Sequence, residues 1–266
     1  MILKIIKNFL IRIFYVFNIK ITINKINNNL DWVMFDKNSW MPYLNKNNNF
    51  LFNSYNEGLI KSGSQKSNSF FKEIRHYSLL NIAMNILEKN NYENFAECGC
   101  WKGHSSYSIS LILNKYNFNK KFYIFDSFEG GLPVKKSADY SPKRYKQSKN
   151  DALKQQKHFA SDFKEVSNLF KNFEFIKIYE GWIPAVFNKI NDVKFSFVHI
   201  DVDLYQPTLD SLKYFFPKLI KGGIIVCDDY NYSDFPGAKK AVDEFLKSNE
   251  YELFYEVPLG GCIIIR

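Results

Sequence analysis

Three aspartates stand where two short apolar stretches give way to polar residues, a pattern typical of buried strands that end in a site. They are Asp201 within Val198–Tyr205, and Asp228 with Asp229 within Gly222–Tyr230. Because ligands bind at the carboxyl ends of the strands in open α/β sheets, we expect these side chains to converge. Crowded carboxylates repel one another unless a cation joins them, and hard oxygen ligands suit Mg²⁺ or Ca²⁺. The sequence therefore predicts a divalent metal site.

A glycine-containing turn follows the first predicted strand, at Glu97–Gly103. Gly99 and Gly103 let the backbone turn sharply and approach a ligand closely, and the N-terminus of the next helix offers free N–H groups. Ser105 or Ser106 is suited to capping that helix. The glycine spacing does not match the G-x-G-x-x-G fingerprint of dinucleotide-binding folds, which disfavours NAD as a cofactor.

Asp126, Trp182 and Tyr230 are candidates for contacts with a ribose, a base or a sugar. Asp126 ends the second predicted strand, where an acidic residue is suited to hydrogen bonds with both ribose hydroxyls. Its alternative role is structural, in a turn or a helix cap. Trp182 and Tyr230 could stack on a ring of the ligand. Because 18% of the chain is aromatic, core packing is the default expectation for each of them.

The size and composition indicate one sizeable domain. The chain has 266 residues, of which 46% are hydrophobic, enough for one core with a short appendage. The net charge of +9 would suit nucleic acid, an anionic membrane or an acidic ligand, but no nucleic-acid-binding motif is present, which disfavours nucleic acid. The four cysteines lack the spacing of a zinc site, and we expect buried free thiols in a reducing cytoplasm.

Residues 71–266 alternate strand and helix patterns and are predicted to form this domain. The predicted strands are Phe95–Glu97, Lys121–Asp126, Phe173–Tyr179, Phe195–Asp201, Gly223–Asp228, Tyr251–Tyr255 and Cys262–Arg266. The predicted helices are Glu73–Leu87, Ser105–Leu113, Thr208–Leu219 and Ala238–Lys247, with a short one from Pro184. The fold class is α/β: a seven-stranded, mostly parallel sheet with a terminal antiparallel hairpin and helices on both faces.

Two segments fall outside this alternation. Residues 134–160 form a basic insert, rich in Ser, Lys and Gln and without a strand pattern, which is a candidate for a mobile lid. Residues 1–70 are predicted to form an N-terminal amphipathic helix and a variable cap or arm. In residues 1–17 the apolar side chains fall on one side of a helix, but charges interrupt the run too often for a membrane span. This helix either lies on a membrane surface or packs on protein, and the sequence leaves both alternatives open.

Six motifs, in the same order along the chain, resemble those of the macrocin O-methyltransferase (TylF/MycF) family. The resemblance covers about residues 72–250. The motifs are Glu97-x-Gly99-x-x-x-Gly103, Phe125–Gly130, Gly181–Pro184, His199–Thr208, Gly222–Gly223 with Asp228–Tyr230, and Pro236–Phe245. The family comprises class I methyltransferases with a Rossmann-like fold, which methylate sugar hydroxyls with S-adenosylmethionine and Mg²⁺. The extra glycine Gly131, after Asp126, departs from its pattern.

The resemblance implies a role for each matched residue. The methionine end of S-adenosylmethionine would lie along Glu97, Gly99 and Gly103. Its ribose and adenine side would be held by Asp126 and Ser127. Further cofactor contacts are expected from Ser105, beside the glycine turn, and from Trp182. The resemblance also implies that Asp201, Asp228 and Asp229 bind the metal, the same three carboxylates as above, and that the protein is a homodimer.

The chemistry of such a site depends on removing a proton from a sugar hydroxyl. A divalent cation on that oxygen lowers its pKa, and the sulfonium supplies an activated methyl group, so the transfer needs mainly alignment. Asp201 is favoured as the base. His199 is the second candidate, on the same face of the strand, although a packed structural histidine is the default expectation. Asp203 is expected to orient Asp201 or to cap the next helix.

Three functions therefore remain open. The first is a Mg²⁺-dependent O-methyltransferase that acts on a sugar, in a surface polysaccharide or a glycosylated metabolite. The second is a non-catalytic S-adenosylmethionine-binding module in a glycan assembly complex. The third is an O-methyltransferase for a catechol-like acceptor. The expected location is cytoplasmic, with residues 1–17 as the candidate for peripheral contact with the inner face of the membrane.

Overall fold

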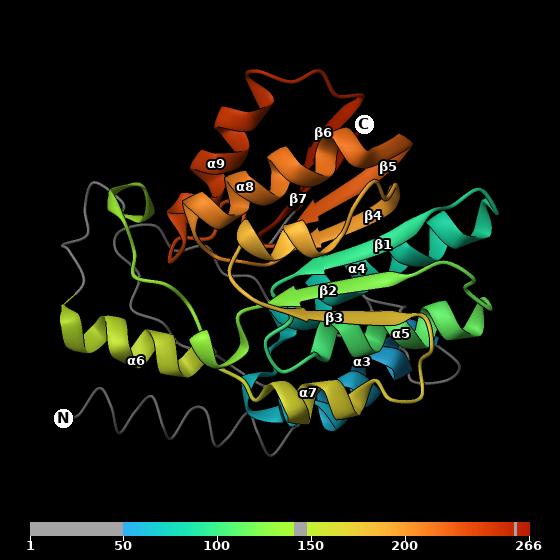
Figure 1. Ribbon diagram of the computed structural model, residues 1–266, viewed down its shortest axis with the longest axis horizontal. Helices are drawn as coiled ribbons and strands as arrows, with labels where there is room; N and C mark the ends of the chain where they lie inside the picture. The colour runs from blue at the N-terminus through green and yellow to red at the C-terminus, as the bar shows by residue number, and fades with distance from the viewer. Residues whose placement is uncertain (1–49, 141–147, 258–259) are drawn as a thin grey trace, which may run out of the picture. The chain divides into compact units, whose positions relative to one another are not determined.

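A seven-stranded sheet between two layers of helices forms the core of the region that the structure describes (Figure 1). The structure is a computed structural model, and it describes residues 50–140, 148–257 and 260–266. The predicted helix at residues 1–17 and most of the predicted arm lie outside these ranges. Within them, no helix combines the length and the apolar character that crossing a membrane requires.

The strands have the order β3-β2-β1-β4-β5-β7-β6. Their bounds are β1 (Asn94–Cys98), β2 (Phe122–Asp126), β3 (Ile176–Glu180), β4 (Phe195–Ile200), β5 (Leu219–Cys227), β6 (Leu253–Glu256) and β7 (Cys262–Ile265). The first five are parallel, and β7 runs antiparallel to both β5 and β6. This confirms the predicted fold class. Every residue of the central strand β4 is buried, which explains why its sequence is a nearly continuous run of apolar residues and does not alternate between apolar and polar ones.

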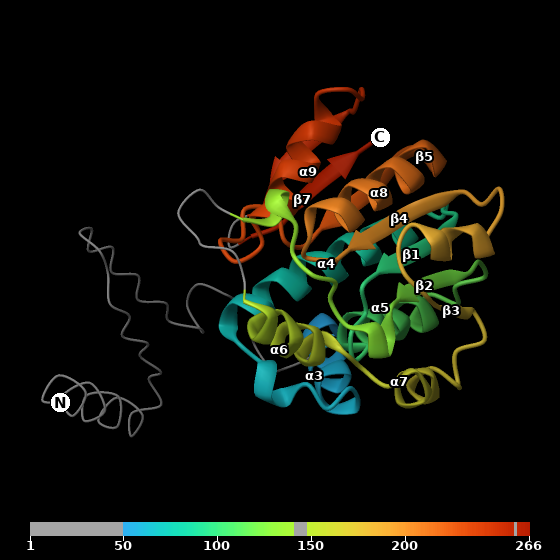
Figure 2. The same ribbon diagram turned by 60° about the vertical axis from the view of Figure 1, so that its left-hand side comes forward.

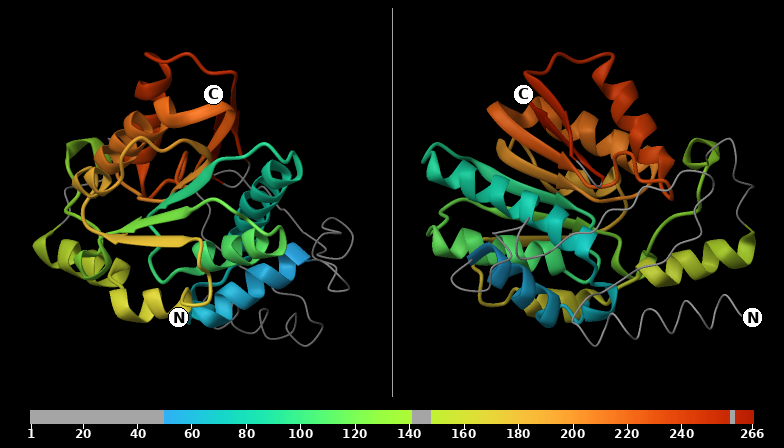
Figure 3. Two further views of the ribbon diagram at one scale, coloured as in Figure 1. Left: turned by 45° about the vertical axis from the view of Figure 1, so that its right-hand side comes forward. Right: turned by 180° about the vertical axis from the view of Figure 1, so that it is seen from behind.

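The helices cover both faces of the sheet (Figure 3). Their bounds are α3 (Phe50–Lys61), α4 (Phe70–Glu88), α5 (His104–Lys115), α6 (Lys149–Phe159), α7 (Phe163–Leu169), α8 (Tyr205–Phe215) and α9 (Pro236–Leu246). Leu80 of α4, Ile112 of α5 and Val166 of α7 belong to the apolar core on one face. Leu212 of α8 and Val242 of α9 belong to the core on the other. The four cysteines are buried and free, as predicted.

Helix α3 occupies part of the segment in which no long periodicity was expected. Its buried apolar residues are Leu51, Tyr55 and Leu59, only one per turn, which gives a narrow stripe rather than a broad apolar face. The helix packs closely on α5, because a Cβ added at Gly58 would lie only 2.3 Å from the Ser108 Oγ. Tertiary packing on α5 therefore accounts for a helix that the sequence pattern left out.

The insert between β2 and β3 contains regular structure in its described residues. Ser137–Asp139 form a turn of 3₁₀-helix, and α6 follows later in the insert. Figure 1 shows α6 beyond the carboxyl ends of β1 and β2. In Figure 2, the 3₁₀ turn lies close to α9, and α6 lies toward the side of α3. The insert thus stands at the edge of the sheet where the strand order reverses between β1 and β4, the usual place for a ligand in such folds.

Candidate active site

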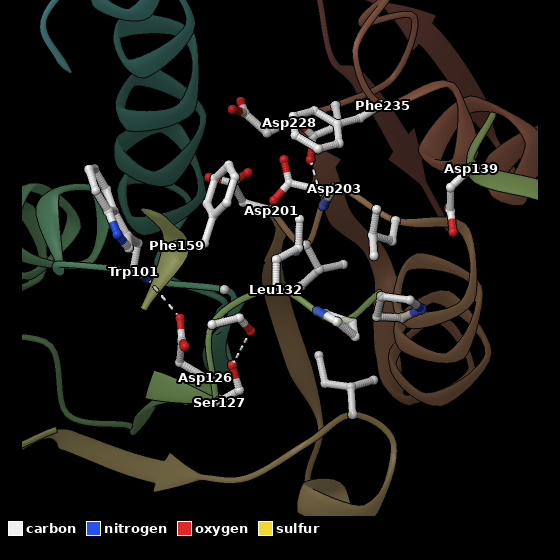
Figure 4. Close-up of a pocket in the computed structure, with 18 of the residues that line it drawn as sticks. Trp101, Asp126, Ser127, Leu132, Asp139, Phe159, Asp201, Asp203, Asp228 and Phe235 are labelled. Carbon is white, nitrogen blue, oxygen red and sulfur yellow. Dashed lines mark hydrogen bonds between the residues drawn. The ribbon is translucent and has the colours of Figure 1, made fainter. Parts of the chain in front are cut away.

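A cavity of about 540 Å³ lies at the carboxyl ends of the parallel strands. Seven of the predicted site residues line it: Gly99, Asp126, Ser127, Trp182, Asp201, Asp228 and Asp229. Figure 4 shows Asp201, Asp203 and Asp228 together in one part of the cavity and Asp126 with Ser127 in another. The other predicted site residues, Glu97, Gly103, Ser105 and His199, are not among its lining residues.

Asp201 and Asp228 come together with His199. One ligand atom of each of these three side chains lies within 4.8 Å of the corresponding atoms of the other two. Asp201 follows the end of β4 and Asp228 follows the end of β5, so pairing of the two strands brings the carboxylates side by side. The expected convergence of strand-end carboxylates is therefore present for these two residues.

Asp229 bonds to the backbone of the loop after β4, whereas its neighbour Asp228 belongs to the group of possible metal ligands. Its Oδ2 accepts a hydrogen bond of 2.9 Å from the backbone N–H of Asp203, whose φ is +60°. The group of possible metal ligands formed by the described residues contains His199, Asp201 and Asp228, but not Asp229. Asp229 thus holds the chain after β4 in a left-handed conformation, which stabilises the loop that carries Asp201.

Asp203 does not cap the following helix, contrary to one of its two expected roles. Helix α8 has no side-chain cap from its own preceding residue. The first N–H of the helix, that of Tyr205, instead donates to Oδ1 of Asp139, at 2.7 Å. The cap comes from the insert, 66 residues earlier in the chain, which no local sequence pattern could indicate.

Burial makes the carboxyl groups of Asp201, Asp203 and Asp229 harder to ionise. It raises the pKa of Asp201 to about 6, with the nearby charge of Asp228 as the next cause. Burial also raises the pKa of Asp203 and of Asp229 well above the usual range, and in each case neighbouring aspartates add to the effect. Such mutual repulsion in a dry site is the condition that a bound cation relieves.

His199 is held in a buried hydrogen-bonded chain. Its Nδ1 lies 2.7 Å from Oε1 of Glu97, and the other oxygen of Glu97 accepts a hydrogen bond from the Ser106 hydroxyl. Burial alone would lower the pKa of His199, but the hydrogen bond and charge of Glu97 outweigh burial and raise it to about 9. Glu97 is fully buried, and its contact with Nδ1 fixes the orientation of the imidazole.

Arg75 and Lys72 add two basic side chains that the sequence reasoning missed. Both belong to α4, three residues apart on one face of the helix, and both line the cavity. The Arg75 Nη1 lies 2.8 Å from Oδ2 of Asp228. Burial lowers the pKa of Lys72, while the charges of Asp201 and Asp228 oppose this shift. The i, i+3 spacing of two basic residues on a predicted helix was visible, but nothing in the sequence paired that face with the carboxylates.

Gly99 marks a close approach between the ends of two strands. Its φ is +83°, and a Cβ at this position would lie 1.9 Å from the carbonyl oxygen of Asp201. The Gly99 N–H donates to the carbonyl of Phe125, at 2.8 Å. No other residue type fits here without moving the backbone, so the expectation of a tight turn is confirmed.

The Asp126 carboxylate is anchored by backbone groups. One oxygen accepts hydrogen bonds from the N–H groups of Cys100 and Trp101, at 2.7 and 2.8 Å, and the other from the N–H of Phe128, at 2.7 Å. Burial raises the pKa of Asp126, although these bonds favour its charged form. Asp126 therefore has the structural role that was its alternative interpretation. It also lines the cavity, where carboxylate lone pairs remain for ribose hydroxyls.

The extra glycine, Gly131, is explained by the insert. A Cβ at Gly131 would lie 2.0 Å from the carbonyl oxygen of Gln156 in α6, and the φ of Gly131 is +58°. The Gln156 side chain donates to the carbonyl of Gly130, at 3.0 Å. The Ser127 hydroxyl donates to the carbonyl of Gly131, at 2.6 Å. The departure from the family pattern thus lets α6 pack on the loop after Asp126.

Trp182 and Tyr230 differ from each other in burial. Tyr230 is buried in the core on the side of α9, so core packing is confirmed for it. Trp182 is 46% exposed, lines the cavity and lies against Gly130, so the default expectation of core packing is wrong for it. An exposed indole at the cavity edge is available to a ligand ring, and its contact with the cofactor stays a prediction.

Gly103 and Ser105 belong to the start of α5 rather than to the cavity wall. Gly103 is the residue before the helix, with a φ of +82°, and it faces the ring of Phe170. Helix α5 has no side-chain cap, so the expectation that Ser105 or Ser106 caps it is wrong. Both serines lie inside the helix, since it begins at His104, one residue earlier than Ser105. Their cofactor contacts remain untested predictions.

The part of the cavity away from Asp126 has aromatic and apolar walls. Phe159 of α6 and Phe235, just before α9, meet edge to face with ring centroids 6.0 Å apart. The amine of Lys135 lies over the Phe235 ring and donates to the carbonyl of Asp234. Leu132 also lines this part of the cavity (Figure 4). The insert therefore supplies much of a wall that a sugar ring or a flat aglycone could contact.

A profile of the macrocin O-methyltransferase (TylF) family matches residues 65–262, which is more than half of the chain. The chain belongs to this family. Among curated proteins, this TylF-family chain is 26% identical over 166 residues to demethyldecarbamoylnovobiocin O-methyltransferase of Streptomyces niveus, a match that spans 60% of each protein. It is 24% identical over 155 residues to mycinamicin III 3''-O-methyltransferase of Micromonospora griseorubida, spanning 56% of this chain and 58% of that protein. The chain thus matches about 60% of the length of these relatives.

Solved methyltransferases share the fold. The structure of the O-methyltransferase NovP superposes with a TM-score of 0.58 at 24% identity, covering 71% of this chain and 80% of that one. A methyltransferase of Podospora anserina, solved with S-adenosylhomocysteine bound, superposes with a TM-score of 0.54 at 14% identity, covering 89% of this chain and 99% of that one. At these identities the likeness establishes the class I methyltransferase fold.

The residues of the acidic cluster fit a divalent cation. Ligands on opposite sides of Mg²⁺ or Ca²⁺ stand roughly 4 to 5 Å apart, and the three ligand atoms here all lie within 4.8 Å of one another. The His199 Nε2 is buried and has no hydrogen-bond partner among the described residues, while the Nδ1 contacts Glu97. A histidine held from behind by a carboxylate is a common arrangement among metal ligands. The site thus offers two hard oxygen ligands and one oriented nitrogen.

Proposed function

We propose that this chain is an S-adenosylmethionine-dependent O-methyltransferase that methylates a hydroxyl of a sugar with the help of Mg²⁺. The observation that carries the proposal is one cavity lined both by the glycine turn with Asp126 and by the carboxylates of Asp201 and Asp228. In one space, the glycine turn would hold the methyl donor close to a hydroxyl that a cation on the carboxylates activates.

The relatives support a sugar as the acceptor. One acts on mycinamicin III at a 3'' hydroxyl, and another on the rhamnosyl group of a tetracenomycin derivative, as their names state. We propose a sugar on a glycosylated metabolite or on a surface polysaccharide. The aromatic wall at Phe159 and Phe235 would contact the apolar face of the sugar or its aglycone.

In this proposal Asp201 accepts the proton of the acceptor hydroxyl. Asp201 lines the cavity, whereas His199 does not, so the geometry favours the aspartate. Glu97 would hold the His199 imidazole in place within the cluster. Asp201, Asp228 and His199 would hold Mg²⁺, with Asp229 supporting them, and the bound ion would stabilise negative charge on the acceptor oxygen.

The cofactor would occupy the part of the cavity between Gly99 and Trp182. Gly99 allows close approach of the ligand, Asp126 and Ser127 would face its ribose, and the Trp182 indole would cover its adenine. Glu97, Gly103 and Ser105 would act indirectly, by fixing the turn and the start of α5.

A catechol-like acceptor is the second candidate, because the cavity wall carries flat apolar rings. A vicinal diol on an aromatic ring would use the same cluster, and the aromatic wall would then contact the acceptor ring itself. A non-catalytic binding module is the third candidate. It would bind S-adenosylhomocysteine without any need for the carboxylates.

The deciding experiment is methyl transfer from labelled S-adenosylmethionine to glycosides and catechols, with Mg²⁺ or with chelator, followed by mass spectrometry. We expect transfer to a sugar hydroxyl that requires Mg²⁺. Asp201→Asn should lower turnover by at least about 100-fold and leave S-adenosylhomocysteine binding intact. Asp210→Asn, in α8 outside the cavity, is the matched control and should keep full activity. Full activity in chelator would contradict the metal role, and transfer to catechols alone would contradict the sugar.

We also propose a cytoplasmic location, which the four free cysteines support. Homodimer formation and membrane contact through residues 1–17 remain proposals from the sequence. Analytical ultracentrifugation and flotation with anionic vesicles, each with the full chain and with residues 1–17 removed, test the two separately.

A further inference from the structure

Arg75 forms an ion pair with Asp228, one of the three residues of the acidic cluster (His199, Asp201 and Asp228). Its Nη1 lies 2.8 Å from Oδ2 of Asp228 and donates a longer hydrogen bond, of 3.3 Å, to the backbone carbonyl of the same residue. The side chains of Arg75 and Asp228 are only 21% and 13% exposed. Because water screens such a sheltered pair only weakly, the positive charge of Arg75 also acts on the other residues of the cluster.

The two oxygens of Asp228 face different basic groups. Oδ2 is taken by Arg75, whereas Oδ1 lies 4.0 Å from the His199 Nε2, on the side of the possible metal ligands. Arg75 comes from α4 and His199 from β4, so the carboxylate is enclosed by side chains of two separate elements. The guanidinium therefore already neutralises a carboxylate that a cation in the cluster would also use.

Two effects of Arg75 on cation binding oppose each other. By holding Oδ2, it orients Asp228, which favours binding. As a fixed positive charge a few ångströms from the ligand atoms, it repels a divalent ion and competes with it for Asp228. The repulsion acts on an ion of charge +2 at short range in a site sheltered from water. The orienting effect saves only the entropy of fixing one short side chain, that of Asp228, so the repulsion is the larger effect.

We propose that Arg75 is the resident counter-ion of the carboxylate cluster and competes with the divalent cation for Asp228. This inference rests on the proposed function in taking the cluster as the cation site. In the protein without a cation, Arg75 keeps Asp201 and Asp228 together despite their repulsion. When a cation binds, the interaction of Arg75 with Oδ2 weakens, and this loss lowers the affinity of the protein for the ion.

The test is the affinity for Mn²⁺, measured on the full-length protein from the electron paramagnetic resonance signal of the free ion. We expect Arg75→Met and Arg75→Gln each to tighten Mn²⁺ binding by about tenfold or more, because one neighbouring positive charge is lost. Arg75→Lys should stay close to the wild type, since it keeps the charge. Asp228→Asn should weaken binding in every background.

Lys120→Met is the matched control. Lys120 forms an exposed ion pair with Glu93, at 3.2 Å, so the variant removes the same charge from a surface pair outside the cavity and should leave Mn²⁺ affinity unchanged. Unchanged or weaker binding in both neutral Arg75 variants would overturn the proposal and indicate an orienting role. Absence of Mn²⁺ binding in all variants would overturn it too. Methyl transfer by the wild type is measured separately. If the wild type is active but the neutral Arg75 variants bind Mn²⁺ as the wild type does, the role of Arg75 is overturned and the proposed function stands.

Discussion

Gly99 sets the position of Asp201 through contact between two backbones. The carbonyl oxygen of Asp201 lies 1.9 Å from the place where a side chain at Gly99 would begin. The φ of +83° at Gly99 is also in the left-handed region, which is costly for any residue with a Cβ. The carbonyl and the carboxylate belong to the same residue. A backbone shift there would therefore also move the proposed base.

We expect Gly99→Ala to lower the free energy of unfolding by more than about 3 kcal/mol and to abolish methyl transfer, because backbone strain and overlap add together. Gly63→Ala is the matched control, since Gly63 has a φ of +63° but no atom within 4 Å of an added Cβ. It should cost only about 1 to 2 kcal/mol and leave activity intact. Urea unfolding of both variants measures the difference. Equal losses would show that overlap with Asp201 is unimportant.

At the scale of elements, Asp139 ties the insert to α8 and α9. Its Oδ1 accepts the first N–H of α8, from Tyr205, and its Oδ2 accepts the N–H of Lys136. The Lys240 amine of α9 donates to the carbonyls of Ala138 and Tyr140. The described start of the insert is a docked turn, and it carries residues of the cavity wall.

We expect Asp139→Ala to destabilise the protein by about 1 to 2 kcal/mol and to speed tryptic cleavage after Lys135 or Lys136, because the turn loses its contact with α8. Asp162→Ala is the matched control. Asp162 caps α7 through a 2.7 Å bond from the Glu165 N–H, outside the cavity. That variant should lose similar stability without faster cleavage in the insert. Cleavage at equal rates in both variants would show that Asp139 does not hold the turn.

At the scale of the whole molecule, a buried histidine pair links α4 to α5. The rings of His76 and His104 stack with centroids 4.5 Å apart, and Tyr55 of α3 contacts both rings. Burial, followed by the charge of Lys72, lowers the pKa of His104 to about 3. Burial, followed by the charge of His104, lowers the pKa of His76 well below its usual value. The packing of these three helices thus requires neutral imidazoles.

This pair should make the protein less stable in acid. Below the unfolded-state pKa of about 6.5, the unfolded chain binds a proton at each histidine that the folded chain does not bind until about pH 3 for His104. The free energy of unfolding therefore falls as the pH drops through this window. For His104→Gln, we expect this slope between pH 6 and 4 to shrink by up to about 1.4 kcal/mol per pH unit. Urea unfolding at several pH values measures it. The wild type and the variant should have equal slopes above pH 7, which serves as the control. Equal slopes for the two proteins below pH 6 would contradict the prediction.

Much of the fold followed from local patterns. Each buried parallel strand needs its own apolar run, and each run ends where the chain turns, so all seven strands were predicted, with boundaries that shifted by a few residues. Helix α3 was missed because its buried stripe is one residue per turn. Helix α6 was missed because none of its residues is buried, so it has no apolar face, and α7 was missed because it has only 7 residues.

The sequence by itself determined the class I fold and the meeting of Asp201 with Asp228, because both are consequences of strand order and of residues at strand ends. Only the tertiary structure decided the partners of these carboxylates. Arg75 contacts Asp228 across 153 residues, and Glu97 contacts His199 across 102. No local propensity specifies such pairs, since they depend on how α4 and β1 pack against β4 and β5 and on which charges burial forces together.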